Sequence, residues 1–222
     1  MVLYLLRRRT SNQYWMHRLL FIITLLISFG GTAQSYTKVK NSAAVKDKIN
    51  TQAKSTNAIE ADFKEVIYSS MYNNPKTGNG KLKYKQANKI RWEHILPKKQ
   101  IVLINGSKVR LFEDGKEVKN VASNQIIKKV QSLMMQLFSG DFLNEKEFKV
   151  YYYENESTYR LVLTPKNSRM SKYIARIKMD FDKNSLKLQK MIFIETEADK
   201  IVYTFSSVTF NGQISDSNFT KF

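Results

Sequence analysis

Residues 89–112 read KIRWEHILPKKQIVLINGSKVRLF, and this stretch decides the fold class. Apolar and polar side chains alternate along three parts of it, which is the period-two pattern of strands that bury one face. Pro97 follows the first part, and Asn105 with Gly106 separates the second from the third. Because an Asn-Gly pair tolerates the positive φ angles of a tight turn, the stretch predicts consecutive antiparallel strands. These strands are expected at residues 89–95, 100–104 and 108–112.

The same alternation continues on both sides of this stretch. Ile59, Ala61 and Phe63 alternate with charged residues, and the polar sequence NNPKTGNG at residues 73–80 predicts a turn after them. A sheet with one apolar face, one solvated face and short connections is antiparallel. Further strands are expected at residues 81–85, 147–153, 158–164, 173–181, 186–195 and 201–210. In the run from 173 to 181, the expected apolar face carries Tyr173, Ala175, Ile177, Met179 and Phe181, and the solvated face carries Arg176, Lys178 and Asp180.

A short helix is expected before the first of these strands. Residues 42–54 carry apolar side chains at Val45, Ile49 and Ala53, which share one face of a helix. Ser42 comes just before this apolar stripe and is the expected N-cap.

A second, strongly apolar helix is expected at residues 124–139, with the sequence NQIIKKVQSLMMQLFS. Ser123 or Asn124 can cap its start, and Gly140 can end it. Its methionines and leucines suit a lid over a hydrophobic cavity, and they equally suit a helix that plugs the core of a sandwich. The pattern therefore predicts one mainly β domain of about nine to eleven antiparallel strands, interrupted by this helix.

The N-terminus has the features of a secretory signal peptide. Four arginines precede an uncharged apolar run at residues 19–29, and small residues follow at 31–33. This run is shorter than the roughly 20 residues that span a bilayer, and a single membrane anchor is the alternative. Residues 1–33 are therefore expected to be removed, which leaves a single domain at residues 34–222 in the periplasm. Met16 is a more typical start for such a peptide than the first residue.

The chain is strongly basic. The formal net charge is +18, and removing residues 1–33 lowers it to +14 because four arginines and no acidic residues are lost. An exported protein is not expected to meet nucleic acid. The charge therefore suits lipid headgroups, or it serves solubility alone.

The sequence is poor in groups that carry catalysis. It has no cysteine, which excludes disulfides, thiolate zinc sites and cysteine nucleophiles. It has two histidines, which leaves little for chemistry that depends on histidine. His94 lies in an alternating strand, where we expect it to pack, and no serine stands in a Gly-x-Ser-x-Gly turn. Glu93 with Glu113 or Asp114 would be a carboxylate pair, but carboxylates of strands and turns are usually solvated. We therefore expect no enzyme, no metal site and no cofactor.

Several short motifs follow one another in a fixed order. They are Arg91-Trp92 in a strand, Pro97, the apolar strand 101–104, Asn105-Gly106, Leu161-x-Leu163-x-Pro165, the hairpin 180–188 and Asp216-x-x-Phe219. In this order and spacing they resemble the LolA family of periplasmic lipoprotein carriers, over residues 42–222.

This resemblance implies an incomplete antiparallel β-barrel closed by an α-helical lid. It also implies a monomeric carrier that binds the acyl chains of lipoproteins in a hydrophobic cavity and takes them from an inner-membrane ABC transporter toward an outer-membrane acceptor. The residues expected to line the cavity are Ile90, Trp92, Leu103, Leu111, Met134, Leu137, Phe138 and Phe142.

The sequence departs from the family pattern at one place. Gln86 and Ala87 stand where many members have Arg-Pro, and that arginine is implicated in holding the lid by hydrogen bonds. The resemblance therefore implies either a weaker lid latch at Gln86, which can hydrogen-bond without charge assistance, or a latch that another residue provides. Two alternative functions stay open: a carrier for another amphiphile, such as a glycolipid or polyene lipid, and a periplasmic module that docks a protein partner.

Overall fold

The computed structural model describes residues 35–119 and 125–221, and the side chains of residues 125–131 are not described. The predicted signal peptide at residues 1–33 and the predicted caps Ser123 and Asn124 lie outside the described residues. Every element below belongs to the compact unit Tyr36–Phe222.

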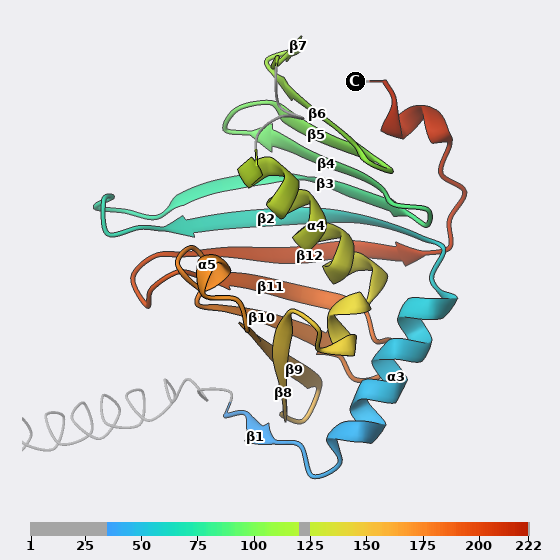
Figure 1. Cartoon of the computed structure of the whole chain (residues 1–222), viewed down its shortest axis with the longest axis vertical. Helices are drawn as coiled ribbons and strands as arrows, with labels where there is room; N and C mark the ends of the chain where they lie inside the picture. The colour runs from blue at the N-terminus through green and yellow to red at the C-terminus, as the bar shows by residue number, and fades with distance from the viewer. Residues whose placement is uncertain (1–34, 120–124, 222) are drawn as a thin grey trace, which may run out of the picture. The chain divides into compact units, whose positions relative to one another are not determined.

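A single antiparallel sheet of twelve strands dominates the described residues (Figure 1). The strands are β1 (Thr37–Lys38), β2 (Ala58–Tyr68), β3 (Lys76–Lys85), β4 (Lys89–Leu96), β5 (Gln100–Asn105), β6 (Lys108–Glu113), β7 (Lys116–Glu117), β8 (Phe148–Glu154), β9 (Thr158–Pro165), β10 (Arg176–Asp182), β11 (Leu188–Ile194) and β12 (Lys200–Phe210). The helices are α3 (Ser42–Ser55), α4 (Gln125–Ser139) and α5 (Ser168–Ser171), with 3-10 turns η3 (Asp141–Asn144) and η4 (Asp216–Phe219).

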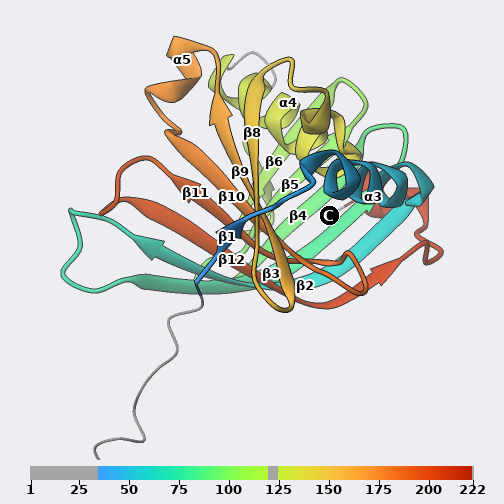
Figure 2. The same cartoon turned by 90° about the horizontal axis from the view of Figure 1, so that it is seen from below.

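The sheet is an incomplete barrel, as the family resemblance implies. Its order is β1-β8-β9-β10-β11-β12-β2-β3-β4-β5-β6-β7, so within the described residues the two outermost strands do not pair with each other. The sheet curves around α4, which lies on its concave side with α3 nearby (Figure 2). The main apolar core lies there, between α3, α4 and the inner faces of the strands.

The short helix α3 forms where the sequence predicts it, but its cap differs. Val45 and Ile49 are buried against the sheet, as the apolar stripe indicates. Asn41, not Ser42, is the N-cap, and its Oδ1 accepts a hydrogen bond from the backbone N–H of Ala44 at 3.0 Å. Helix α4 ends at Gly140, as predicted, because this residue adopts a φ of 81°.

The predicted turn at residues 73–80 is too long, because β3 already begins at Lys76. Two glycines, Gly78 and Gly80, therefore lie inside a strand. Gly80 is the register partner of Phe63 on β2, and a Cβ atom at Gly80 would overlap the Phe63 ring and the carbonyl oxygen of Glu93. The glycine thus makes room for an aromatic ring that crosses the strand.

Two residues of the run from 173 to 181 do not follow the predicted faces. Tyr173 lies before β10, is 66% exposed and is not part of the apolar face. Asp180, expected on the solvated face, is 5% exposed and accepts hydrogen bonds at 2.7 Å from Nε and Nη2 of Arg160. The cation of Arg160 also lies 3.7 Å from the ring centroid of Tyr36, which covers this pair.

A smaller apolar cluster lies on the opposite face of the sheet, formed by Ile101, Leu103 and Phe112. The C-terminal segment lies along this side of β4–β6 (Figure 1). Arg91 and Arg110 hold it there, since they donate to the backbone oxygens of Asn218, Lys221 and Thr220 at 2.8–3.2 Å. The sheet therefore buries apolar side chains on both faces in this region.

Candidate apolar binding cavity

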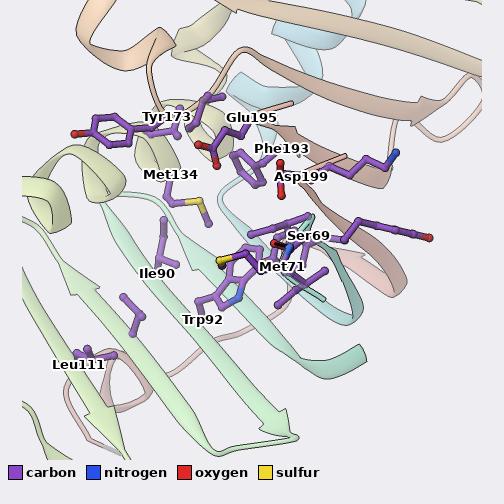
Figure 3. A pocket seen from close by; sticks show the side chains of 18 of the residues that line it. Ser69, Met71, Ile90, Trp92, Leu111, Met134, Tyr173, Phe193, Glu195 and Asp199 are labelled. Carbon is purple, nitrogen blue, oxygen red and sulfur yellow. Dashed lines mark hydrogen bonds between the residues drawn. The ribbon is translucent and has the colours of Figure 1, made fainter. Parts of the chain in front are cut away.

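A cavity of about 740 Å³ lies between the concave face of the sheet and α4 (Figure 3). Volumes of this size are typical of sites that enclose small organic ligands. Its lining is mostly apolar and comes from β2, β4, β5, β6, β11 and β12, from α4, and from the loops that follow β2, β9 and β11. A cavity of the kind that the lid interpretation requires is therefore present beside α4.

The strands β4, β5 and β6 form one wall of the cavity. Strand alternation puts every second side chain on the concave face, so each strand contributes two lining residues. The pairs are Ile90 and Trp92 on β4, Val102 and Ile104 on β5, and Val109 and Leu111 on β6. Of the residues predicted to line the cavity, Ile90, Trp92 and Leu111 lie in this wall.

Helix α4 covers the cavity with Leu133 and Met134. Figure 3 shows the Met134 side chain facing Ile90 and Trp92 from the helix side. Because methionine is flexible and polarizable, its side chain adapts to ligands of different shape. The structure thus brings together four of the predicted residues: Ile90, Trp92, Leu111 and Met134.

The other predicted lining residues lie elsewhere. Leu137 and Phe138 line a separate cavity of about 60 Å³, and Phe138 packs on the ring of Tyr84 at a centroid distance of 6.0 Å. Phe142 belongs to η3 and is 3% exposed in the main core. Leu103 was expected on the wrong face, because it belongs to the small cluster on the other side of the sheet.

The hydrogen bonds of the predicted lid latch Gln86 go to the segment that follows α3. Its Nε2 donates to the carbonyl oxygen of Thr56 at 3.2 Å, and its backbone N–H donates to the carbonyl oxygen of Asn57 at 2.8 Å. Both partners follow directly after α3. Gln86 therefore fixes the link between α3 and β2, and its role as a lid latch stays a prediction.

Sequence reasoning missed the loop residues that lie at the mouth of the cavity. The loop after β2 contributes Ser69, Ser70 and Met71, and the β11–β12 connection contributes Asp199. Asp199 Oδ1 accepts hydrogen bonds from the backbone N–H of Ser70 at 2.7 Å and from its hydroxyl at 3.0 Å, which join the two loops. Together with the hydroxyl of Thr196, these bonds lower the pKa of Asp199 to about 2. Such pairing between distant loops leaves no signal in a single sequence.

A buried carboxylate lies next to the apolar wall. Glu65 on β2 is 7% exposed, and its Oε1 accepts a hydrogen bond from the Tyr203 hydroxyl at 2.6 Å and lies 3.3 Å from Nε2 of His94. Burial alone raises the pKa of Glu65, but the hydrogen bonds of His94 and Tyr203 outweigh it and hold the pKa below its usual value. Burial and the Glu65 carboxylate raise the pKa of Tyr203, so its phenol keeps the proton that it donates. His94 packs edge-on against Phe63, as its position in a strand indicates.

We expect Tyr203→Phe to destabilise the protein by about 1–3 kcal/mol, because Glu65 loses a donor while it stays buried. The measurement is urea unfolding at neutral pH. Because folding lowers the pKa of Glu65, its ionised carboxylate stabilises the folded protein above the pKa that Glu65 has in the unfolded chain. This stabilisation is lost as the pH falls through the pKa of Glu65 in the folded state. The difference between wild type and variant should therefore shrink in acid. Tyr151→Phe, which changes an exposed tyrosine, is the control, and an equal loss in both variants would contradict the role of Glu65.

Within the described residues, no three His, Cys, Asp or Glu side chains are grouped as a metal site would require. No helix in the same residues is both long enough and apolar enough to cross a bilayer.

Comparison with known proteins identifies one family. Residues 54–221 match the family model of the outer membrane lipoprotein carrier protein LolA. A comparison with curated proteins found no match.

Several solved structures are similar in fold. A LolA superfamily protein from Nitrosomonas europaea is 10% identical, with 82% of this chain and 99% of that chain covered and a TM-score of 0.43. An uncharacterized conserved protein from Thermus thermophilus is 8% identical, with 82% and 94% covered and a TM-score of 0.46. The MucA/MucB complex of Pseudomonas aeruginosa contains a chain that is 10% identical, with 81% of this chain and 60% of that chain covered and a TM-score of 0.42.

Proposed function

The chain belongs to the LolA family of outer membrane lipoprotein carrier proteins, and on this premise we propose that it carries acylated lipoproteins across the periplasm. The cavity of about 740 Å³ under α4 is the observation that supports this function most directly. In this proposal the acyl chains of the lipoprotein occupy the cavity, and its peptide part stays outside.

The lining of the cavity suits a reversible carrier. Each methylene moved from water to an apolar site contributes about 0.8 kcal/mol, so an acyl chain of about fifteen carbons gains roughly 12 kcal/mol. Apart from a few polar loop residues such as Ser69 and Asp199, the cavity offers aliphatic, methionine and aromatic side chains, such as Ile104, Met134 and Trp92. Contacts of this kind are non-directional, and they therefore hold acyl chains of various lengths without fixing one geometry.

The route of the cargo is part of the same proposal. An inner-membrane ABC transporter would supply the lipoprotein, and an outer-membrane acceptor would receive it. The signal peptide expected at residues 1–33 would place the protein between these two membranes.

The occupant of the cavity tests the proposal. We expect native mass spectrometry of the protein, purified from the periplasm of its own host, to detect an acylated polypeptide bound to it. The proposal predicts that the mass of the bound acylated polypeptide disappears after a wash with organic solvent that extracts acyl chains. A bound glycolipid or polyene lipid would instead identify a carrier of another amphiphile. A protein that is always purified empty, and that takes up no lipopeptide added to it, would contradict transport by this cavity.

A further inference from the structure

The exposed apolar side chains are concentrated at one end of the sheet. Of the eight large hydrophobic side chains that are exposed among the described residues, seven lie in the loops and strand ends of this end. We call these seven the rim surface: Tyr68, Met71, Tyr72, Ile95, Leu96, Val118 and Tyr173. The eighth, Tyr151, lies in the middle of β8.

The strand register shows that the rim surface belongs to a single end. Tyr68 pairs with Lys200 at the start of β12, Leu96 pairs with Asn79 near the start of β3, and the ends of β6, β9 and β11 point the same way. The cavity opens at this end, because Tyr68, Met71 and Tyr173 both line it and are exposed. A partner that covers the rim surface therefore also covers the mouth of the cavity.

Basic residues accompany the rim surface. The segments at this end contain eleven lysines and arginines against eight acidic residues; they are residues 68–76, 95–100, 113–119, 145–148, 165–176 and 194–200. Two lysines lie directly over rim tyrosines, with Lys76 Nζ 3.7 Å from the ring centroid of Tyr72 and Lys200 Nζ 5.2 Å from that of Tyr68. Tyrosine with an adjacent lysine suits the boundary between apolar chains and anionic headgroups, where one part of the pair is buried and the other stays hydrated.

We propose that the rim surface docks onto an anionic phospholipid bilayer, with Met71 and Tyr173 inserted among the lipids and the surrounding lysines on the headgroups. Met71 is 82% exposed and Tyr173 is 66% exposed, and they come from loops far apart in the sequence. A bilayer accepts such separate apolar side chains without a complementary shape, and its negative surface attracts the basic loops. This proposal does not require lipid in the cavity, so it goes beyond the carrier function.

Vesicle co-sedimentation tests the proposal with the exported protein. We expect wild type to bind vesicles of phosphatidylethanolamine and phosphatidylglycerol, to bind phosphatidylcholine vesicles weakly, and to lose binding at high salt. The double variant Met71→Ser, Tyr173→Ser should bind about tenfold less, because two inserted side chains are lost. Both residues are largely exposed, so the variant keeps its packed interior, which circular dichroism would verify.

Two controls make the outcome decisive. Tyr151→Ser removes the exposed aromatic side chain outside the rim surface and should bind vesicles like wild type. Met134→Gln, which makes the cavity lining polar without changing the net charge, should also bind vesicles like wild type even where it takes up less apolar ligand. The proposal is overturned if wild type does not bind anionic vesicles, if the double variant binds as well as wild type, or if Met134→Gln loses vesicle binding, since the signal would then report lipid uptake.

Discussion

We expect Met134→Glu to lower the affinity of the protein for an apolar fluorophore by about tenfold or more, a change that fluorescence titration would measure. Met134 projects from α4 into the cavity and faces Ile90 and Trp92 (Figure 3). A carboxylate at this position must either stay hydrated inside the cavity or lose its water when the ligand binds, and both oppose the burial of an apolar molecule. The expected loss corresponds to at least about 1.4 kcal/mol of binding free energy.

Gln136→Glu is the matched control for this prediction. It adds the same charge two residues further along α4, where the Gln136 side chain donates to the Ser132 hydroxyl and does not line the cavity. Affinity should therefore stay close to that of wild type. If both variants lose binding equally, the net charge of the helix and not the cavity lining controls affinity, and the assignment of the cavity as the binding site fails. Leu137→Glu would be a poor test, because Leu137 is 4% exposed in the core.

We expect Gly80→Ala to destabilise the protein by about 3 kcal/mol, at the upper end of what overpacking usually costs. The added methyl group would overlap the carbonyl oxygen of Glu93 on β4 and the ring of Phe63 on β2. Neither neighbour can move easily, since Phe63 is 2% exposed and packs against Trp92 at a ring-centroid distance of 5.0 Å. Relief would require strands β2, β3 and β4 to shift together. Chemical denaturation measures the loss.

Gly212→Ala provides the corresponding control. A Cβ atom at Gly212 meets no heavy atom within 4 Å, so the same substitution should leave the free energy of unfolding nearly unchanged. A Gly80→Ala protein as stable as wild type would show that the sheet does not depend on the close approach of Phe63 to this strand.

Local sequence signals account for most of the architecture. Alternating residues and the Asn105-Gly106 turn predict the central hairpins, and helical spacing together with Gly140 predicts α4 and its end. These features depend on neighbours in the chain, which is why a single sequence contains them. The overlong predicted turn at residues 73–80 has a different origin. Its glycines resemble a loop sequence, yet Gly80 is fixed by the Phe63 ring of another strand.

The residues of the cavity were harder to predict, because period-two alternation defines two faces without saying which one is concave. In β5 both faces are apolar: Val102 and Ile104 line the cavity, whereas Ile101 and Leu103 pack on the other side. The C-terminal segment that lies over that side follows β5 by more than a hundred residues. The hydrogen bond that joins the loops after β2 and β11, and the bond of Gln86 to Thr56, likewise depend on contacts between distant segments.

The way in which α4 rests on the sheet has a thermodynamic consequence. In the part of α4 whose side chains are described, contacts with the strands are apolar, as in the packing of Phe138 on Tyr84 and Trp92, and the hydrogen bonds of its side chains stay within the helix and the turn after it. Separating such surfaces exposes hydrocarbon to water, which carries a large heat-capacity change and little dependence on ionic strength. Any separation of α4 from the sheet would therefore respond to warming, cooling and cosolvents far more than to the salt content of the medium.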